Sequence, residues 1–245
     1  MRYIHIILIT TFLTSVYVYA QGAGTAVNYH RASSEDVTFA GFCNPDFNLT
    51  TAMTIAAWVK WDETGDQDDW ANICSNNSHY GSDDGQFWLQ HNNQNTYFEF
   101  AVETNTSRKF VFASNTAIVT EKWYHVTGVY DSQAASDQLK IYVNGELDNT
   151  NSHSGTITPW SDDYFMAVGR WCHENSFRSF HGIIDELSIW NIALDANEIK
   201  NLMCKKLQGD ESGLQGYWRF DDDNDGDEVE DLTSNGNYGW IFNEV

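Results

Sequence analysis

A carboxylate inside a mostly apolar segment is the first feature of the sequence that could do chemistry. Asp185 lies between two isoleucines and the leucine, isoleucine and tryptophan that follow it, within residues 183–190. Burying an unpaired charge costs several kcal/mol or more in free energy. Asp185 is therefore expected either to accept hydrogen bonds from backbone N–H groups or to bind a cation, and the residues alone leave both interpretations open.

An acidic run near the end of the chain is the second feature. Residues 221–227 read Asp-Asp-Asp-Asn-Asp-Gly-Asp, which places oxygen donors at Asp221, Asp223 and Asp225 and a glycine at the sixth position, as in the first half of a calcium-binding loop. The twelfth position is Leu232, where such a loop needs a glutamate, and the flanks predict strands rather than helices. A solvated acidic turn is therefore the favoured interpretation, and a metal site here is the weaker candidate.

The usual patterns of hydrolytic catalysis are missing from the sequence. A glycosidase needs two carboxylates that flank the bond to be cleaved. Asp185 and Glu186 are neighbours, so on a regular strand their side chains would point to opposite faces. No Glu-x-Asp-x-x-Glu triplet and no serine in a nucleophile-elbow context occurs, and His125 lies inside a predicted strand. We therefore predict no catalytic residues and a binding module rather than an enzyme.

Composition and charge restrict the partners and the compartment. The net charge of −22 argues against nucleic acid as a partner. Residues 1–20 combine Arg2, an apolar run and a small-residue end, which predicts a signal peptide cleaved before Gln21. No other apolar run is long enough to span a bilayer. No repeat or linker divides residues 21–245, so we expect one exported domain, either secreted or held in the periplasm or at the cell surface.

The remaining pattern predicts strands. β-branched and aromatic residues separated by polar clusters recur in residues 27–39, 54–61, 86–90, 97–103, 110–113, 123–130, 139–143, 164–169, 183–190 and 216–220. Asn144-Gly145 suits a tight hairpin turn. Only residues 193–207 show helical spacing, with Asp195 as the cap. The strand spacing indicates a β-sandwich, and the strand tryptophans are expected in its core, namely Trp58, Trp123, Trp190 and Trp218.

Several of these segments also resemble a known family, in the family's order. Residues 53–60 (MTIAAWVK), the hairpin of residues 123–126 and 139–145, residues 180–194 (FHGIIDELSIWNIAL) and residues 216–220 (GYWRF) are similar to motifs of the laminin G-like jelly rolls of the concanavalin A-like superfamily. The resemblance covers almost the whole chain after residue 20. It implies an all-β, two-sheet antiparallel jelly-roll sandwich with one short helix near the C-terminus.

The resemblance also implies a structural calcium ion near the N-terminal strands. Calcium takes about six to eight oxygen ligands. Asp185 is the first candidate ligand, with Asp36 and backbone carbonyls as co-ligands. The acidic run is the weaker alternative.

A set of ring side chains is expected on one face of such a fold. Five of them lie in or near loops that the fold would bring together, namely Trp70, Tyr80, Trp88, Trp171 and His173. Aromatic faces stack on sugar rings while amides and carboxylates accept hydrogen bonds from hydroxyls. The competing interpretation is that most of these rings only pack in the core or at sheet edges. The predicted function is glycan binding; the alternatives are a protein-binding adhesion domain or, less favoured, a polysaccharide-active enzyme.

Four cysteines follow the predicted signal peptide, and an even number in an exported chain favours two disulfides. Three pairings are possible. Our hypothesis joins Cys74 to Cys172, which would clamp two of the loops that carry the rings, and Cys43 to Cys204. The cysteines show no zinc-site spacing.

Overall fold

The computed structural model describes residues 27–29, 37–43, 46–62, 70–78, 85–92, 96–159, 164–171, 178–221 and 228–244. The predicted signal peptide, residues 1–20, lies outside the described residues, so export stays a prediction. Within the described part of the chain, no helix has the length and hydropathy that crossing a bilayer requires.

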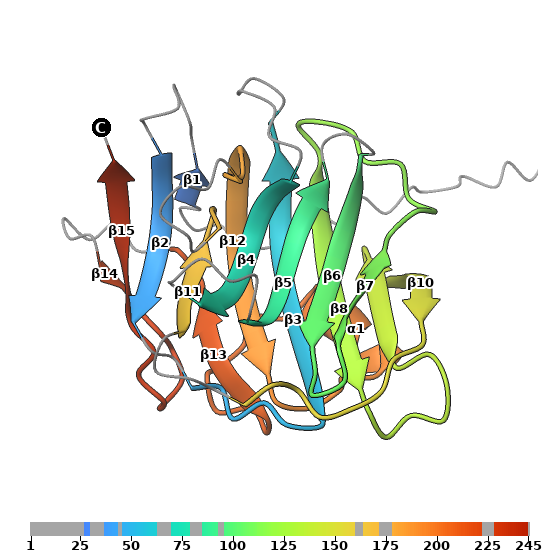
Figure 1. Ribbon diagram of the computed structural model, residues 1–245. Helices are drawn as coiled ribbons and strands as arrows, with labels where there is room; N and C mark the ends of the chain where they lie inside the picture. The colour runs from blue at the N-terminus through green and yellow to red at the C-terminus, as the bar shows by residue number, and fades with distance from the viewer. Residues whose placement is uncertain are drawn as a thin grey trace, which may run out of the picture.

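The strands form two antiparallel sheets that lie face to face (Figure 1). One sheet has seven strands in the order β1-β12-β3-β8-β9-β10, with β13 also paired to β12. These strands are β1 (Val27–Tyr29), β3 (Ala52–Trp61), β8 (Trp123–Asp131), β9 (Leu139–Val143), β10 (Glu146–Asn151), β12 (Gly182–Trp190) and β13 (Leu214–Trp218).

The other sheet has eight strands in the order β14-β15-β2-β11-β4-β5-β6-β7. They are β2 (Val37–Cys43), β4 (Trp70–Ser78), β5 (Gly85–Asn92), β6 (Tyr97–Glu103), β7 (Arg108–Phe112), β11 (Tyr164–Val168), β14 (Glu228–Val229) and β15 (Gly239–Glu244). The predicted all-β, two-sheet antiparallel jelly-roll sandwich is confirmed.

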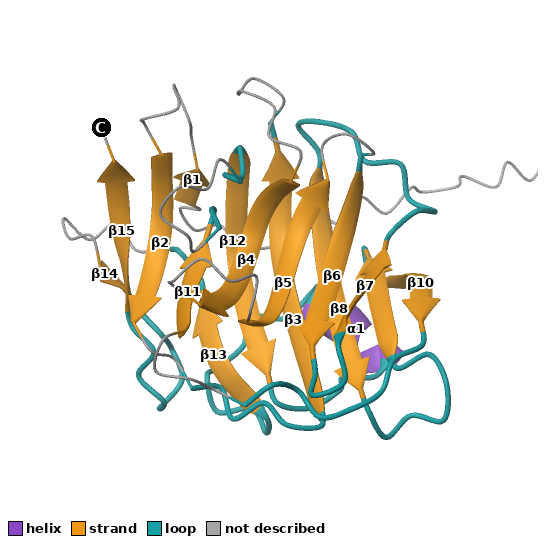
Figure 2. Ribbon diagram, in the orientation of Figure 1, coloured by secondary structure: helices purple, strands orange, loops and turns teal. Residues whose placement is uncertain are grey.

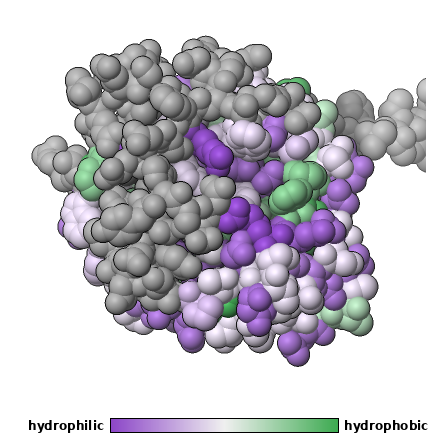
Figure 3. Space-filling view, viewed as in Figure 1, coloured by the Kyte–Doolittle hydropathy of each residue, from purple (hydrophilic) through white to green (hydrophobic). Residues whose placement is uncertain are grey.

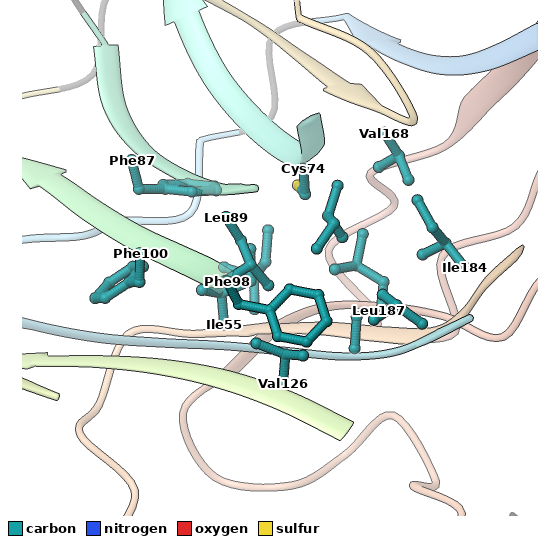
Figure 4. Packing of buried hydrophobic residues seen from close by; sticks show 14 of the residues in the cluster. Ile55, Cys74, Phe87, Leu89, Phe98, Phe100, Val126, Val168, Ile184 and Leu187 are labelled. Atoms are coloured by element: carbon teal, nitrogen blue, oxygen red, sulfur yellow. The ribbon is translucent and has the colours of Figure 1, made fainter. Parts of the chain in front are cut away.

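The core lies between the two sheets because each strand alternates its side chains between the two faces. Phe98 and Phe100 of β6 point inward and are fully buried, as are Val126 of β8 and Ile184 of β12 from the other sheet. Figure 4 shows these side chains packed together between the sheets. The residues between them on β6 therefore point away from the core, onto the outer face of the eight-stranded sheet.

The hairpin and the helix form as the sequence predicts, with one correction. Asn144 and Gly145 join β9 to β10 with φ of 52° and 76°, the left-handed values of a type I′ turn. The helix α1 (Ala196–Leu202) begins at Asp195, whose carboxylate accepts from two backbone N–H groups in a capping box with Glu198. It packs on the outer face of the seven-stranded sheet (Figure 2). It is shorter than the predicted residues 193–207, because residues 193–195 form its cap and residues 203–207 leave the helix.

One expected strand is wrong. The single extended stretch predicted over residues 27–39 is two strands that belong to different sheets, β1 next to β12 and β2 between β15 and β11. The chain crosses from one sheet to the other between them. Alternating apolar residues on both sides of this crossing give no signal of the change of sheet.

Candidate functional site

A groove on the outer face of the eight-stranded sheet holds most of the ring side chains on that face. It has a volume of about 390 Å³ and is lined by side chains from β4 to β7 and by the residues next to β11. Six rings line it, namely Trp70, Trp88, Tyr97, Phe110, Phe112 and Trp171. Figure 3 shows this face of the molecule, where strongly hydrophilic residues lie beside hydrophobic ones in its exposed part.

Strand alternation places the groove residues. Phe87 and Leu89 of β5 belong to the core, so Trp88 and Gln90 between and beside them point outward. On β6 the same alternation turns Glu99 outward between Phe98 and Phe100. The register pairs Gln90 with Glu99 across the two strands. The floor of the groove is therefore built on two central strands with fixed backbones.

Glu99 is the acceptor at the floor of the groove. Its Oε1 accepts hydrogen bonds from Trp88 Nε1 and from Gln90 Nε2, both at 2.8 Å. The side chain is only 5% exposed, and this burial raises the pKa of Glu99, although the two hydrogen bonds and the positive charge of Arg178 act in the opposite direction. The two donors fix the carboxylate in one orientation.

Two arginines stack on the tryptophans. The Arg178 guanidinium lies 4.7 Å from the ring centroid of Trp171 and 5.2 Å from that of Trp70. The Arg108 guanidinium lies 4.9 Å from the ring centroid of Trp88, and the indoles of Trp88 and Trp171 meet edge to face at 5.6 Å. These distances are those of cation–π contacts. The side chains therefore form a continuous stack along one wall of the groove.

Another part of the rim is a cluster of three rings. Phe112 lies 4.9 Å from Phe110 and 4.8 Å from Tyr97 between ring centroids. Phe110 is 42% exposed, which is unusual for a phenylalanine. Phe110 packs on Phe112, which packs in turn on Tyr97, so this exposed ring offers a supported apolar surface to a ligand.

The structure thus brings together three of the five predicted ring residues, Trp70, Trp88 and Trp171. Tyr80 and His173 lie outside the described residues. Sequence reasoning missed Glu99, Arg108, Arg178 and Phe110, which share this groove. The alternation of the strand predicted over residues 97–103 could have placed Glu99 on the outer face, but no pattern in the sequence indicates that Arg178 meets two tryptophans.

A second, smaller cleft lies on the outer face of the seven-stranded sheet and corrects one expectation. Asp185 and Glu186 both line it, together with Trp58, His125 and Tyr217. The register between β12 and β3 shifts after Asp185, and Glu186 has a φ of 52°. This bulge breaks the strand alternation, so the two carboxylates do not point to opposite faces as predicted.

This cleft is too small for a sugar ring. It encloses about 30 Å³, room for about one or two water molecules, and the residues that follow α1 cover it. Glu186 accepts a hydrogen bond from the Tyr217 hydroxyl. His125 is buried against Trp58, with ring centroids 5.3 Å apart, and its burial lowers its pKa to about 3. His125 is therefore neutral at pH 7.

The predicted core tryptophans have different environments. Trp218 is fully buried between the sheets, and Trp190 is buried under α1. Trp58 is buried but belongs to the cleft on the outer face, and Trp123 is only half-buried. A tryptophan on a strand of a sandwich can face either way, so burial between the sheets does not follow from its position in a strand motif.

The sequence of this folded region identifies the family. Residues 31–200 match the family model of the concanavalin A-like lectin/glucanases superfamily. The chain belongs to this superfamily. The resemblance inferred from the strand motifs is confirmed. No curated protein sequence matches the chain significantly.

Three solved structures of the concanavalin A-like fold show the same architecture. A Bacteroides ovatus protein provisionally assigned as carbohydrate-binding has a TM-score of 0.66 at 23% identity, over 88% of this chain and 57% of that one, so this chain spans little more than half its length. A heptameric pentraxin from Limulus polyphemus has a TM-score of 0.53 at 16% identity, over 72% and 80% of the two chains. The carbohydrate-binding module CBM40 of a Ruminococcus gnavus sialidase, solved with α2,3-sialyllactose, has a TM-score of 0.53 at 15% identity, over 74% and 96%.

The calcium site implied by the resemblance stays a prediction, because most of its candidate ligands lie outside the described residues. The described residues contain no group of three His, Cys, Asp or Glu side chains placed to hold a metal ion. Asp185 Oδ1 accepts a hydrogen bond from the backbone N–H of Glu186 at 2.9 Å. Such a hydrogen bond is the alternative to cation binding that the sequence left open. Asp221 pairs with Lys206 at 3.2 Å and Arg219 at 3.4 Å. The co-ligand Asp36 and the other two candidates, Asp223 and Asp225, lie outside the described residues.

Replacing Asp185 distinguishes a carboxylate that only accepts a backbone hydrogen bond from one that binds calcium. Burial, followed by the charge of Glu186, raises the pKa of Asp185 from 3.8 to about 7. The folded state then binds the proton more tightly than the unfolded state, so stability falls as the pH rises from about 4 to about 7. Asp185→Asn removes this charge and should stabilise the protein by about 4 kcal/mol at pH 8 and by less than about 1 kcal/mol at pH 4.

Urea unfolding at pH 4, 6 and 8 measures this difference, with calcium and with a chelator. Asp131→Asn is a suitable control, because Asp131 is a half-buried carboxylate at the end of β8 in the same sheet. A loss of stability in Asp185→Asn that appears only with calcium present would instead identify Asp185 as a calcium ligand.

The structure describes only some of the cysteines in the two predicted disulfides, Cys74–Cys172 and Cys43–Cys204. Cys74 is buried in β4 and pairs across the sheet with Val168 of β11. Val168 lies four residues before Cys172 in the sequence. Cys172 lies outside the described residues, so a bond between Cys74 and Cys172 stays a prediction. Cys204 is an exposed free thiol after α1, on the outer face of the seven-stranded sheet, whereas Cys43 ends β2 in the other sheet. The structure therefore does not contain the predicted bond between Cys43 and Cys204.

Proposed function

We propose that this protein is a non-catalytic carbohydrate-binding module and that the groove on the eight-stranded sheet is its binding site. The observation that carries the proposal is the pairing of an exposed ring cluster around Phe110 with a fixed carboxylate, Glu99, in one groove. A pyranose ring has apolar C–H faces and polar hydroxyl edges. The ring cluster suits the faces, and Glu99 and Gln90 suit the hydroxyls.

The related structures add an argument by analogy. The same fold carries carbohydrate binding in the Ruminococcus gnavus module, and the Bacteroides ovatus protein has been given this role provisionally. A shared fold does not fix a function. The proposal therefore rests on the side chains of the groove, and the analogy only shows that the fold suits such a site.

A non-catalytic role is supported by the carboxylates. Among the described residues that line the groove, Glu99 is the single carboxylate. Hydrolysis of a glycosidic bond by the usual mechanism needs two. The adjacent pair Asp185 and Glu186 lines the small cleft on the other sheet, where a sugar does not fit.

A protein-binding adhesion domain is the second candidate. One observation favours it: Trp240 and Phe242 point to the same face of β15, and each is more than 40% exposed. Exposed apolar patches often mark protein contacts. Substituting these two residues would then abolish partner binding without changing the groove.

A glycan array with the purified chain tests the main proposal. We expect binding to a restricted set of glycans, and loss of that binding in Phe110→Ala, because the exposed ring is removed from the rim. Running the array with calcium and with a chelator tests the calcium prediction at the same time. Silence on every glycan, from protein shown to be folded, would favour the protein-binding alternative.

A further inference from the structure

Two acceptor oxygens on the floor of the groove lack a donor. Glu99 Oε1 accepts from Trp88 Nε1 and Gln90 Nε2, but within the described part of the chain nothing donates to Glu99 Oε2. The buried Gln90 Oε1 also has no partner among the described residues. Glu99 and Gln90 are only 5% and 3% exposed. Unpaired acceptors at this depth cost free energy in the folded protein, so their presence calls for a ligand that donates.

The contact between Glu99 and Gln90 fixes which atoms stay unpaired. A carboxylate can only accept, so Gln90 must turn its amide NH2 toward Glu99 and keep its carbonyl oxygen for another donor. The Trp88 indole has a single N–H, which is also used on Glu99 Oε1. Glu99 and Gln90 therefore offer acceptor oxygens to a ligand, and the matching ligand group is a hydrogen-bond donor.

The register of the sheet places an exposed ring beside this pair. Phe110 of β7 is opposite Ala101 of β6, which makes Phe110 the diagonal neighbour of Glu99 on the outer face. Diagonal neighbours lie about 7–8 Å apart, within reach of long side chains. Ala101 is also opposite Trp88, so a small side chain separates the two large rings. A sugar stacked on Phe110 can therefore reach Glu99 with its hydroxyl edge.

The donor that suits this position is a hydroxyl rather than an ammonium group. Within the groove, the guanidinium of Arg108 lies over the ring of Trp88. The guanidinium of Arg178 lies over the rings of Trp70 and Trp171. These indole faces are the surfaces on which a ligand cation would make its cation–π contacts, and they are occupied. Sugar hydroxyls donate without needing such a face.

We propose that the groove selects glycans by two neighbouring unsubstituted hydroxyls, which donate to Glu99 and Gln90, and that it rejects the same sugar when these hydroxyls are acylated or alkylated. This selectivity rests on the proposed carbohydrate-binding function and adds its ligand class and the residues that determine it. A sugar without the donors leaves buried acceptors unpaired, and sites built to bind a hydroxyl discriminate strongly against analogues that lack it.

Fluorinated analogues of a glycan recognised on the array test the selectivity by calorimetry. Each hydroxyl is replaced in turn by fluorine, which is close to it in size but cannot donate. We expect affinity to fall about tenfold or more at two neighbouring positions, because buried acceptors then lose their donors, and to change less than about threefold elsewhere. O-acetylation at the same two positions should weaken binding at least as much.

Glu99→Gln separates selectivity from a structural role. Trp88 and Gln90 hold the new amide oxygen in place of Oε1, so an NH2 donor replaces the free acceptor Oε2. Affinity for the native glycan should fall about tenfold or more, and the preference over the fluorinated analogue at the Glu99 position should disappear. Glu146→Gln, an exposed carboxylate of β10 in the other sheet, controls for the lost charge, and melting temperature reports any change in folding.

The possible failures are distinguishable. Equal binding of every fluorinated analogue would overturn the selectivity while the carbohydrate-binding function stands. The same loss of affinity for native and fluorinated glycans in Glu99→Gln would give Glu99 a structural role only. Preferred binding of glycans with a free amino group would overturn the assignment of hydroxyls. No binding to any glycan by folded wild-type protein would overturn the proposed function itself.

Discussion

Trp88→Ala is expected to weaken glycan binding by a factor of about thirty or more. Trp88 contacts three other residues that line the groove, so its loss should disturb the groove most. Its indole supports Arg108, packs edge to face on Trp171, and donates the hydrogen bond that orients Glu99. Central aromatic residues of this kind typically contribute about 2 kcal/mol or more to binding.

The measurement is isothermal titration calorimetry with a glycan recognised on the array. Trp240→Ala is the matched control: it removes the same side chain from the same sheet, but at β15, which does not line the groove. Trp88 is 7% exposed and Trp240 is 44% exposed, so the unfolding free energy of both variants should be measured as well. Unchanged binding in folded Trp88→Ala would place the ligand elsewhere.

The strands that the sequence predicted best are those with regular alternation. β6 and β9 have the predicted bounds, because their inward residues are apolar and their outward residues differ in polarity or size. β4 was not predicted. Its sequence WANICSNNS contains three asparagines, which strands disfavour, yet Asn72 and Asn76 are fully buried within it. Tertiary packing between β11 and β5 overrides that local preference.

The candidate site was predictable only in part, for a physical reason. Loop and strand tryptophans indicate where rings can gather, and Trp70, Trp88 and Trp171 do gather. Arg178 lies over Trp171, which is only seven residues before it, and also over Trp70, which is more than one hundred residues before it in the sequence. Such a contact depends on how the fold joins distant segments, and a single sequence carries no period or spacing that encodes it.

The pair Asp185 and Glu186 shows the limit of strand alternation. The rule that neighbours on a strand point to opposite faces holds only while the strand is regular. Here Glu186 adopts a φ of 52° at a shift in register, and both carboxylates line one cleft. A glutamate at positive φ is uncommon, and nothing in its sequence context marks it.

Trp218→Ala is expected to lower the free energy of unfolding by about 4 kcal/mol, the largest loss of stability that we predict. Trp218 ends β13 and is fully buried between the sheets, with its ring 5.1 Å from that of Phe42 and 6.2 Å from that of Phe47. Its Nε1 donates to the carbonyl of Asn237 at 2.9 Å. Truncation to alanine leaves a large cavity and removes the donor to this carbonyl.

Chemical denaturation at pH 7 measures this loss, and Trp240→Ala again provides the comparison. Trp240 lies on the outer face, so its truncation should change stability by less than about 1 kcal/mol. Because Trp218 joins the seven-stranded sheet to β2 of the other sheet through Phe42, its loss should also loosen the packing of the two sheets and lower the cooperativity of unfolding. Similar losses in the two variants would show that the sheets are not held together at Trp218.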